Sequence, residues 1–200
     1  MIARAGEHGS PSSVGISRED ARIIAGQIGR DRVSPGTVAR RCRHGCPVLI
    51  LMGEGCASPG HGPEGEGDLW GAAADLLWLT CPFLHDAIHG LETRGYVKKI
   101  ESFLDGAAEF SEEAQASHED FISLRRISFP RLLSRGKEDP LREEIAGSGV
   151  GGRRGAKGLK CLHAHFAHYL LNGRNIVGSI TSRLLGDLLE CDDARCRRFV

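Results

Sequence analysis

The 200-residue chain has the length of one ordinary domain, and 40% of its residues are hydrophobic, enough to bury a core. Its 26 lysine and arginine residues balance 26 aspartate and glutamate residues, so the formal net charge is zero. A chain without an overall electric field is not expected to bind nucleic acid or a membrane surface. Composition leaves a protein partner possible and the oligomeric state open.

Residues 1–15 are rich in Gly, Ser and Pro, so we expect a flexible N-terminal extension without the apolar stretch of a secretory signal. The longest apolar runs, Pro47–Met52 and Gly71–Leu79, fall short of the roughly 20 residues that a membrane-spanning helix needs. We therefore expect a cytoplasmic protein with a single domain over residues 16–190 and a C-terminal tail over residues 191–200.

The first part of the chain predicts one helix and a small sheet. Ser17 is a suitable N-cap for a helix that ends near Ile28. Val38–Met52 has the composition of extended structure, interrupted at Arg41–Gly45, and Leu76–Thr80 predicts a further strand. We expect these strands to pair across the glycine-rich loop between them.

The rest of the chain has apolar residues at helical spacing. The predicted elements are a helix from Pro82 to about Gly95, a short strand Tyr96–Ile100, one or two helices in Phe103–Arg135 with a break at Pro130, a helix Leu159–Leu171 and a last helix Ser179–Glu190. The predicted class is therefore α+β, a mostly helical single domain with a small sheet.

The chain contains seven cysteines, and their role depends on the compartment. In a reducing cytoplasm they are core residues, metal ligands or reactive thiols rather than a disulfide framework. A free cysteine is most often a small buried hydrophobic residue. That interpretation applies to Cys56, Cys191 and Cys196 unless they cluster.

The densest group of metal-binding side chains is Lys160–His168, which contains Cys161, His163, His165 and His168. On a regular helix Cys161, His165 and His168 share one face, while His163 points to the opposite side. Thiolate and imidazole are the ligands that zinc or iron prefers. The alternative is a helix whose histidines make structural hydrogen bonds and whose cysteine packs in the core.

Two other segments offer ligands for the same site. Cys42 and Cys46 flank a short turn that also contains His44. Cys81 lies at a strand end just before a predicted helix, where the helix N-terminus would lower the pKa of the thiol. Because such ends commonly meet at one edge of a fold, we expect Cys42, Cys81 and Cys161 to converge.

The glycine-rich run before Cys161 supports a separate, weaker hypothesis. Gly149, Gly151 and Gly152 precede several basic residues that end with Lys160. Backbone N–H groups of such a loop can hold a phosphate. The run has neither the Gly-Lys-Ser/Thr of a Walker loop nor the strand that precedes a dinucleotide fingerprint, so a plain flexible loop is the alternative.

These motifs together resemble an uncharacterised bacterial family, domain of unknown function 501, over about residues 36–180. The resembling elements are Arg41-Cys42-x-x-Gly45-x-Pro47, Leu79-Thr80-Cys81-Pro82-x-Leu84, Leu91-Glu92-x-x-Gly95, His118-Glu119, Gly149-Val150-Gly151-Gly152, Lys160-Cys161-Leu162-His163, Ala167-His168, Asn175 and Val177-Gly178.

The resemblance implies that Cys42, Cys81, Cys161, His163 and His168 are the family-type residues, and it implies no reaction. It conflicts with the helical face that favours His165. If Cys161 belongs to a loop or first turn, His163 can turn toward it, and we adopt this second arrangement.

Three hypotheses follow. The first is a protein that binds one metal ion, zinc rather than an iron–sulfur centre, through Cys42, Cys81, Cys161, His163 and His168. The second is an enzyme in which Cys161 and His163 act on a phosphorylated or acyl substrate. The third is a protein-interaction module that docks a partner on the acidic face Glu109–Asp120.

Overall fold

The computed structural model describes residues 16–29, 36–54, 73, 75–106, 108–134, 140–152 and 158–199. Its first helix, α1 (Arg18–Ile28), begins as predicted, because the Ser17 side chain accepts a hydrogen bond from the Asp20 backbone N–H. The helix ends at Gly29, whose left-handed φ of 64° suits glycine.

The sheet has three antiparallel strands in the order β1 (Gly36–Arg41), β2 (Pro47–Met52) and β3 (Leu77–Leu79). Strand β2 is in the centre and almost wholly buried, as expected for a continuous apolar run covered on both faces. Its pairing with β3, with Leu49 opposite Leu79, confirms the predicted pairing across the loop.

The remaining elements are helical and confirm the mostly helical α+β class. They are α3 (Pro82–Thr93), α4 (Tyr96–Asp105), α5 (Ala108–Ser128), α6 (Pro130–Ser134), α7 (Pro140–Gly147), the 3-10 helix η2 (Val150–Gly152), α8 (Leu162–Asn172), α9 (Ile176–Leu185) and the 3-10 helix η3 (Arg195–Phe199). Among the helices that the structure describes, none has both the length and the apolarity to cross a bilayer.

The strand predicted at Tyr96–Ile100 is wrong, because these residues begin helix α4. Ile100 and Leu104 are buried four residues apart, while Lys98 and Lys99 are exposed. This pattern is that of an amphipathic helix. The helical spacing can be recognised only when the sequence is followed beyond Ile100 to Leu104.

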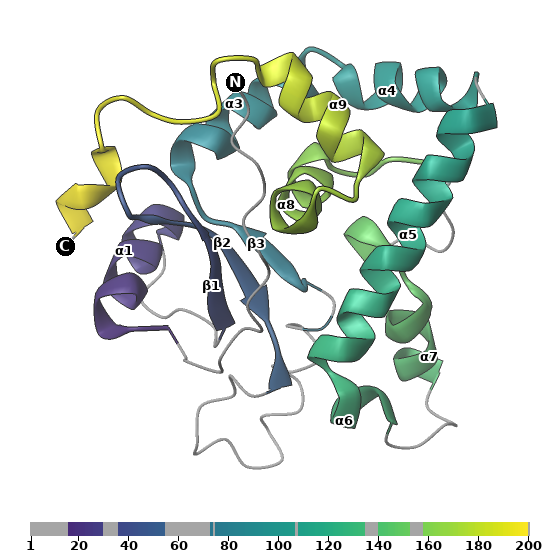
Figure 1. The fold of residues 1–200 in the computed structure, drawn as a ribbon, viewed down its shortest axis with the longest axis horizontal. Helices are drawn as coiled ribbons and strands as arrows, with labels where there is room; N and C mark the ends of the chain where they lie inside the picture. Colours follow the sequence, from purple (N-terminus) through teal and green to yellow (C-terminus); the bar gives the residue numbers. More distant parts are fainter. Residues whose placement is uncertain are drawn as a thin grey trace.

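Helix α8 occupies the centre of the molecule, between the sheet and the long helix α5 (Figure 1). One apolar cluster joins α8 to α3, α4 and α9, and it includes Leu84, Ile88, Leu91, Ile100, Leu162, Phe166 and Val177. A second cluster fills the space between the sheet and α5–α7, and it includes Ile50, Met52, Leu76, Phe121, Phe129 and Ile145. Helix α8 is therefore held in place by the apolar packing around it.

Helix α1 and the C-terminal residues lie beside the sheet (Figure 1). Arg41 of β1 forms an ion pair with Asp20 of α1 at 2.7 Å. Helix η3 packs on α1, where a Cβ added at Gly26 would lie 2.3 Å from the Phe199 ring. The described part of the C-terminal tail is thus packed against the domain.

Helices α8 and α9 cross at Gly178. A Cβ at this position would lie 2.4 Å from the His165 carbonyl oxygen and 2.4 Å from the Tyr169 Cβ. Contacts this short are not found between real atoms, so the close approach of the two helices requires glycine.

We predict that Gly178→Ala lowers the free energy of unfolding by about 1–3 kcal/mol, because the added methyl group forces α8 and α9 apart. Gly90→Ala is the matched control, since Gly90 lies inside α3 with nothing within 4 Å of the added Cβ. The control should be unchanged or more stable by up to about 1 kcal/mol. Urea denaturation followed by circular dichroism measures both variants, and equal stabilities would contradict the prediction.

Candidate functional site

The N-terminus of α8 is held by a carboxylate from another helix. Cys161 is the N-cap residue and has an extended backbone (φ −154°, ψ 125°), but its side chain makes no capping hydrogen bond. Instead, the Leu162 N–H donates to Oε1 of Glu92 on α3 at 2.6 Å. A carboxylate is favourable here because the first N–H groups of a helix lack partners and carry partial positive charge.

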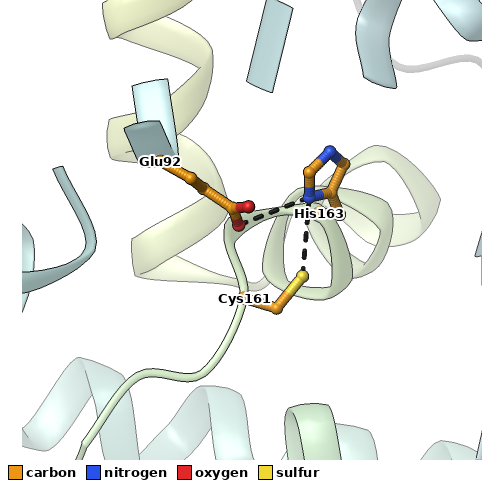
Figure 2. Close-up of side chains that lie close together, drawn as sticks. All are labelled: Glu92, Cys161 and His163. Carbon is orange, nitrogen blue, oxygen red and sulfur yellow. Dashed lines mark hydrogen bonds and ion pairs between the residues drawn. The ribbon is translucent and has the colours of Figure 1, made fainter. Parts of the chain in front are cut away.

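This arrangement brings three different ligand atoms together (Figure 2). Nδ1 of His163 lies 3.5 Å from Sγ of Cys161 and 3.3 Å from Oε1 of Glu92. All three atoms lie within 4.8 Å of one another. The side chains of His163 and Glu92 remain 17% and 22% exposed, so the group is accessible from solvent.

The contact of the other ring nitrogen of His163 determines which nitrogen carries the hydrogen in the neutral ring. Nε2 lies 3.0 Å from the His85 carbonyl oxygen, which can only accept a hydrogen bond. Nε2 therefore carries a hydrogen. In the neutral ring the lone pair is then on Nδ1, directed toward Cys161 and Glu92.

The surroundings of His163 favour a positive charge. Burial alone would lower the pKa of the imidazole, but the contact with Cys161, the His85 carbonyl and the charge of Glu92 together raise the pKa to about 9. At neutral pH and without another cation, the ring is therefore protonated. A metal ion at the same point would replace this proton.

His85 covers one side of the group. Its ring lies against that of His163, with centroids 4.5 Å apart and planes inclined by 37°. The His85 side chain is 59% exposed, so it forms part of the surface around the site.

The structure thus brings together two of the expected ligands, Cys161 and His163. The helical face that paired Cys161 with His165 is wrong, because Cys161 is extended and precedes the first helical residue. The alternative in which His163 turns toward Cys161 is confirmed by their contact. Glu92 was missed as a ligand, although Leu91-Glu92-x-x-Gly95 is one of the elements that carry the family resemblance.

Cys42, Cys81 and His168 lie elsewhere. Within the described ranges, Glu92, Cys161 and His163 are the one group of at least three potential ligand atoms so close together. Cys42 lies at the turn between β1 and β2. Cys81 is the N-cap of α3 as expected, but burial raises the pKa of its thiol to about 11. The expected lowering by the helix N-terminus is wrong, because desolvation outweighs it.

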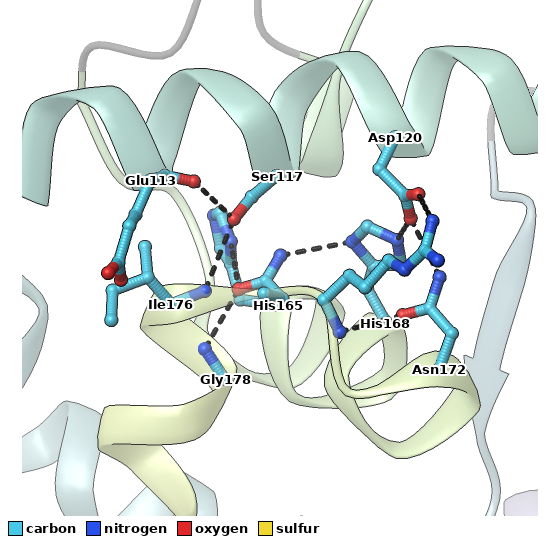
Figure 3. A network of polar contacts seen from close by, with 10 residues as sticks. Glu113, Ser117, Asp120, His165, His168, Asn172, Ile176 and Gly178 are labelled. Atoms are coloured by element: carbon cyan, nitrogen blue, oxygen red, sulfur yellow. Dashed lines mark hydrogen bonds and ion pairs between the residues drawn. The ribbon is translucent and has the colours of Figure 1, made fainter.

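His168 belongs to a buried polar network (Figure 3). Its Nε2 lies 2.9 Å from Oδ2 of Asp120, and its Nδ1 lies 3.1 Å from Nδ2 of Asn175. Oδ1 of Asn175 accepts from the Gly178 N–H at 2.8 Å and faces Nδ1 of His165 at 3.3 Å. These two histidines therefore make structural hydrogen bonds, which was the alternative to metal binding in the sequence analysis.

The network consists of neutral histidines and one ionised acid. Burial lowers the pKa of His165 to about 4 and also lowers the pKa of His168. Burial would raise the pKa of Asp120, but hydrogen bonds from Asn172 and His168 hold it below its ordinary value. A surface cavity of about 390 Å³ borders Asp120 and Asn175. It lies at the C-terminal end of α8, whereas Cys161 is at the other end.

The glycine run lies beside the start of α8. Gly151 and Gly152 have left-handed φ values of 68° and 72°, and a Cβ at Gly151 would lie 3.5 Å from the Lys160 Cβ. Gly149 packs against His118, so closely that a Cβ there would lie 1.9 Å from Nδ1. The basic residues at 153–157 lie outside the described residues. Phosphate binding by Gly149, Gly151, Gly152 and Lys160 stays a prediction.

The comparisons with known proteins identify the family. A family model described as "Protein of unknown function (DUF501)" matches residues 38–183. The chain therefore belongs to this family, as the sequence motifs suggested. No curated protein and no solved structure matches the chain significantly.

We predict that the buried histidine network makes the fold sensitive to acid. His165 has a folded-state pKa of about 4, below its value in the unfolded chain, so protonation favours unfolding as pH falls from about 6.5 to about 4. In His165→Gln this loss of stability should be smaller by about 1–3 kcal/mol.

Urea denaturation at several pH values measures the effect. His89→Gln removes an exposed histidine of α3 and serves as the control, with the pH dependence of the wild type. If His165→Gln and the wild type lose stability in parallel between these pH values, the prediction is contradicted.

Proposed function

We propose that this DUF501 chain binds one divalent metal ion, zinc in preference to iron, through Cys161, His163 and Glu92. The observation that supports this proposal is that Sγ, Nδ1 and Oε1 lie within 4.8 Å of one another. The His85 carbonyl adds a second argument. Metal-binding histidines commonly donate their other ring N–H to such an oxygen, which orients the ring.

The donor set favours zinc over an iron–sulfur centre. One thiolate, one imidazole and one carboxylate are each common zinc ligands. Iron–sulfur clusters are held mainly by several cysteine thiolates, and this group contains a single cysteine. A thiolate ligand also requires a reduced thiol, which agrees with the cytoplasmic location expected from the sequence.

The number of ligands points to a catalytic kind of site. Structural zinc sites use four protein ligands, whereas catalytic ones use three and leave a position for water or substrate. Zinc at such a site lowers the pKa of bound water and so supplies a nucleophile for hydrolysis. The exposed ring of His85 lies against that of His163 at the surface of this group.

We expect Cys161→Ser and His163→Ala to contain one metal ion less per chain than the wild type, because each removes one of three ligands. Glu92→Gln should bind the metal more weakly, since the amide is a poorer ligand than a carboxylate. Emission spectrometry on protein purified without chelators measures the content. His89→Ala, which removes an exposed imidazole from α3, should match the wild type. Folded Cys161→Ser and His163→Ala with full metal content would refute the proposal.

A second candidate is a cysteine nucleophile without metal. It is favoured by the contact between Cys161 and an imidazole whose pKa is about 9, since a protonated His163 stabilises a neighbouring thiolate. Cys161 also precedes α8, where the helix N-terminus adds to the effect. In this reading, Gly149, Gly151, Gly152 and Lys160 would bind the phosphate of a phosphorylated substrate, and an acyl substrate is the alternative.

For this candidate, we predict that Cys161 of metal-free protein reacts with iodoacetamide at about pH 7 more than about tenfold faster than in His163→Ala. The reason is that the positive charge of a protonated His163 would stabilise the neighbouring thiolate, which is the nucleophile. Peptide mass mapping after timed quenching follows Cys161 separately from the other cysteines. Equal rates in the two proteins would exclude the thiolate–imidazolium pair and leave the metal proposal intact.

A further inference from the structure

A second group of cysteines lies at the turn between β1 and β2. The Cys42 N–H donates to the Cys46 carbonyl at 3.0 Å, and the Gly45 N–H donates to the Cys42 carbonyl at 2.9 Å. Gly45 has a left-handed φ of 82°, which closes the turn. Cys42 and Cys46 therefore lie opposite each other at the base of the turn, and Cys42 packs against the cluster that contains Cys46.

The C-terminal segment brings Cys196 into the cluster with Cys46 and places Cys191 close enough to Cys196 for its charge to act on that thiol. Cys196 is 4% exposed and forms a buried cluster with Ile23 and Cys46, against which Cys42 packs. Cys191 is 6% exposed and lies outside any helix or strand. Residues about 150 positions apart in the sequence therefore meet here.

Polar contacts fix the segment over the turn. Arg43 donates through Nη2 to the Cys191 carbonyl at 2.8 Å, and Nε2 of His44 lies 2.8 Å from the same oxygen. Arg43 also forms ion pairs with Glu190 and Asp192. The two residues between Cys42 and Gly45 thus hold the backbone of Cys191 close to the turn.

The surroundings of two of these thiols, Cys46 and Cys196, disfavour the ionised form. Burial and the neighbouring thiols of Cys42 and Cys196 raise the pKa of Cys46 to about 11. Burial also raises the pKa of Cys196, while the Gln27 amide N–H that donates to its Sγ at 3.3 Å and the charge of Arg195 act in the opposite direction. Amide donors and nearby cations of this kind stabilise metal thiolates.

We propose that Cys42, Cys46, Cys191 and Cys196 bind a second metal ion, a zinc ion in a closed structural site, which anchors the C-terminal segment to the β1–β2 turn. The ligands form two close pairs, Cys-x3-Cys and Cys-x4-Cys, from two separate segments, as structural zinc sites do. Each thiol that binds the ion releases its proton to solvent.

Binding requires the sulfur atoms to move closer together. Of the residues that the structure describes, only the Glu92 group already has three ligand atoms within 4.8 Å of one another. The two pairs differ in how easily they adjust. Cys42 and Cys46 are fixed by the hydrogen bonds of the turn, whereas Cys191 lies outside regular structure and Cys196 lies in the five-residue helix η3. The ion would draw the C-terminal pair inward.

This proposal does not rest on the Cys161 site, so the test uses Cys161→Ala, which removes that site. Full-length Cys161→Ala, purified in reducing buffer with zinc, should contain one zinc ion per chain by emission spectrometry. Adding Cys46→Ser or Cys196→Ser to this background should abolish it. Adding Cys81→Ala should not, although Cys81 is a buried cysteine close enough to Cys191 and Cys196 for their charges to act on it.

Stability gives a second measurement. A zinc chelator should lower the melting temperature of Cys161→Ala by roughly 10 °C, as loss of a tightly bound ligand does, and should not change that of the Cys46→Ser double variant. Metal-free Cys161→Ala that is folded and insensitive to the chelator would overturn the proposal. Zinc retained in the Cys46→Ser or Cys196→Ser variants, zinc lost with Cys81→Ala, or an intact mass lower by two hydrogens, which indicates a disulfide, would each overturn it as well.

Discussion

The geometry of the site depends on one hydrogen bond, from the Leu162 N–H to the carboxylate of Glu92. Hydrogen bonds to charged groups stabilise a fold by about 1.5–3 kcal/mol, more than neutral ones, and this carboxylate also meets the positive end of α8. Leu162 is fully buried in the apolar cluster that joins α8 to α3, so packing and capping both hold the start of α8 against α3. The result is that Cys161 stays extended and His163 is placed in the first turn. Glu92 therefore has two roles, since the oxygen that caps the helix also completes the group of potential ligands.

The three histidines of α8 show how strongly position determines chemistry. His163 lies beside a thiol, a carbonyl and a carboxylate, and its pKa is raised to about 9. His165 and His168 lie two and five residues further along, where burial lowers the pKa of both. In the buried network Asn175 satisfies one ring through its oxygen and the other through its amide group, so neither ring needs a charge. The N-terminal end of the helix thus gathers opposite charges at a surface, while further along the helix two neutral histidines belong to a structural junction.

The sequence was sufficient for elements whose signals are local. The cap at Ser17, the buried strand around Leu49 and the break at Pro130 depend on propensity and spacing within a few residues, and each is present in the structure. Tyr96–Ile100 failed because five residues do not distinguish a strand from the first turn of an amphipathic helix. Glu92 could not be found from spacing, because its relation to Cys161 exists only after α3 packs on α8. The choice of His163 over His165 came from the family resemblance, and it agrees with the structure because Cys161, as the cap residue, does not follow the helical period.

The expected convergence of Cys42, Cys81 and Cys161 is not found among the residues that the structure describes. Cys42 and Cys81 do not join Cys161, and the residues gathered near them are Cys46, Cys191 and Cys196, which the resemblance did not include among the family-type residues. The family match ends at residue 183, so the last two of these cysteines lie beyond it. A thiol group that combines a family position with residues outside the matched region is expected to serve the stability of this chain. The Cys161 group, built wholly from residues within the match, is where a chemistry common to the family would lie. Under the two proposals the groups therefore differ in purpose as well as in place: the cysteine group would be closed by four like ligands, and the Cys161 group would be left open by three unlike ones.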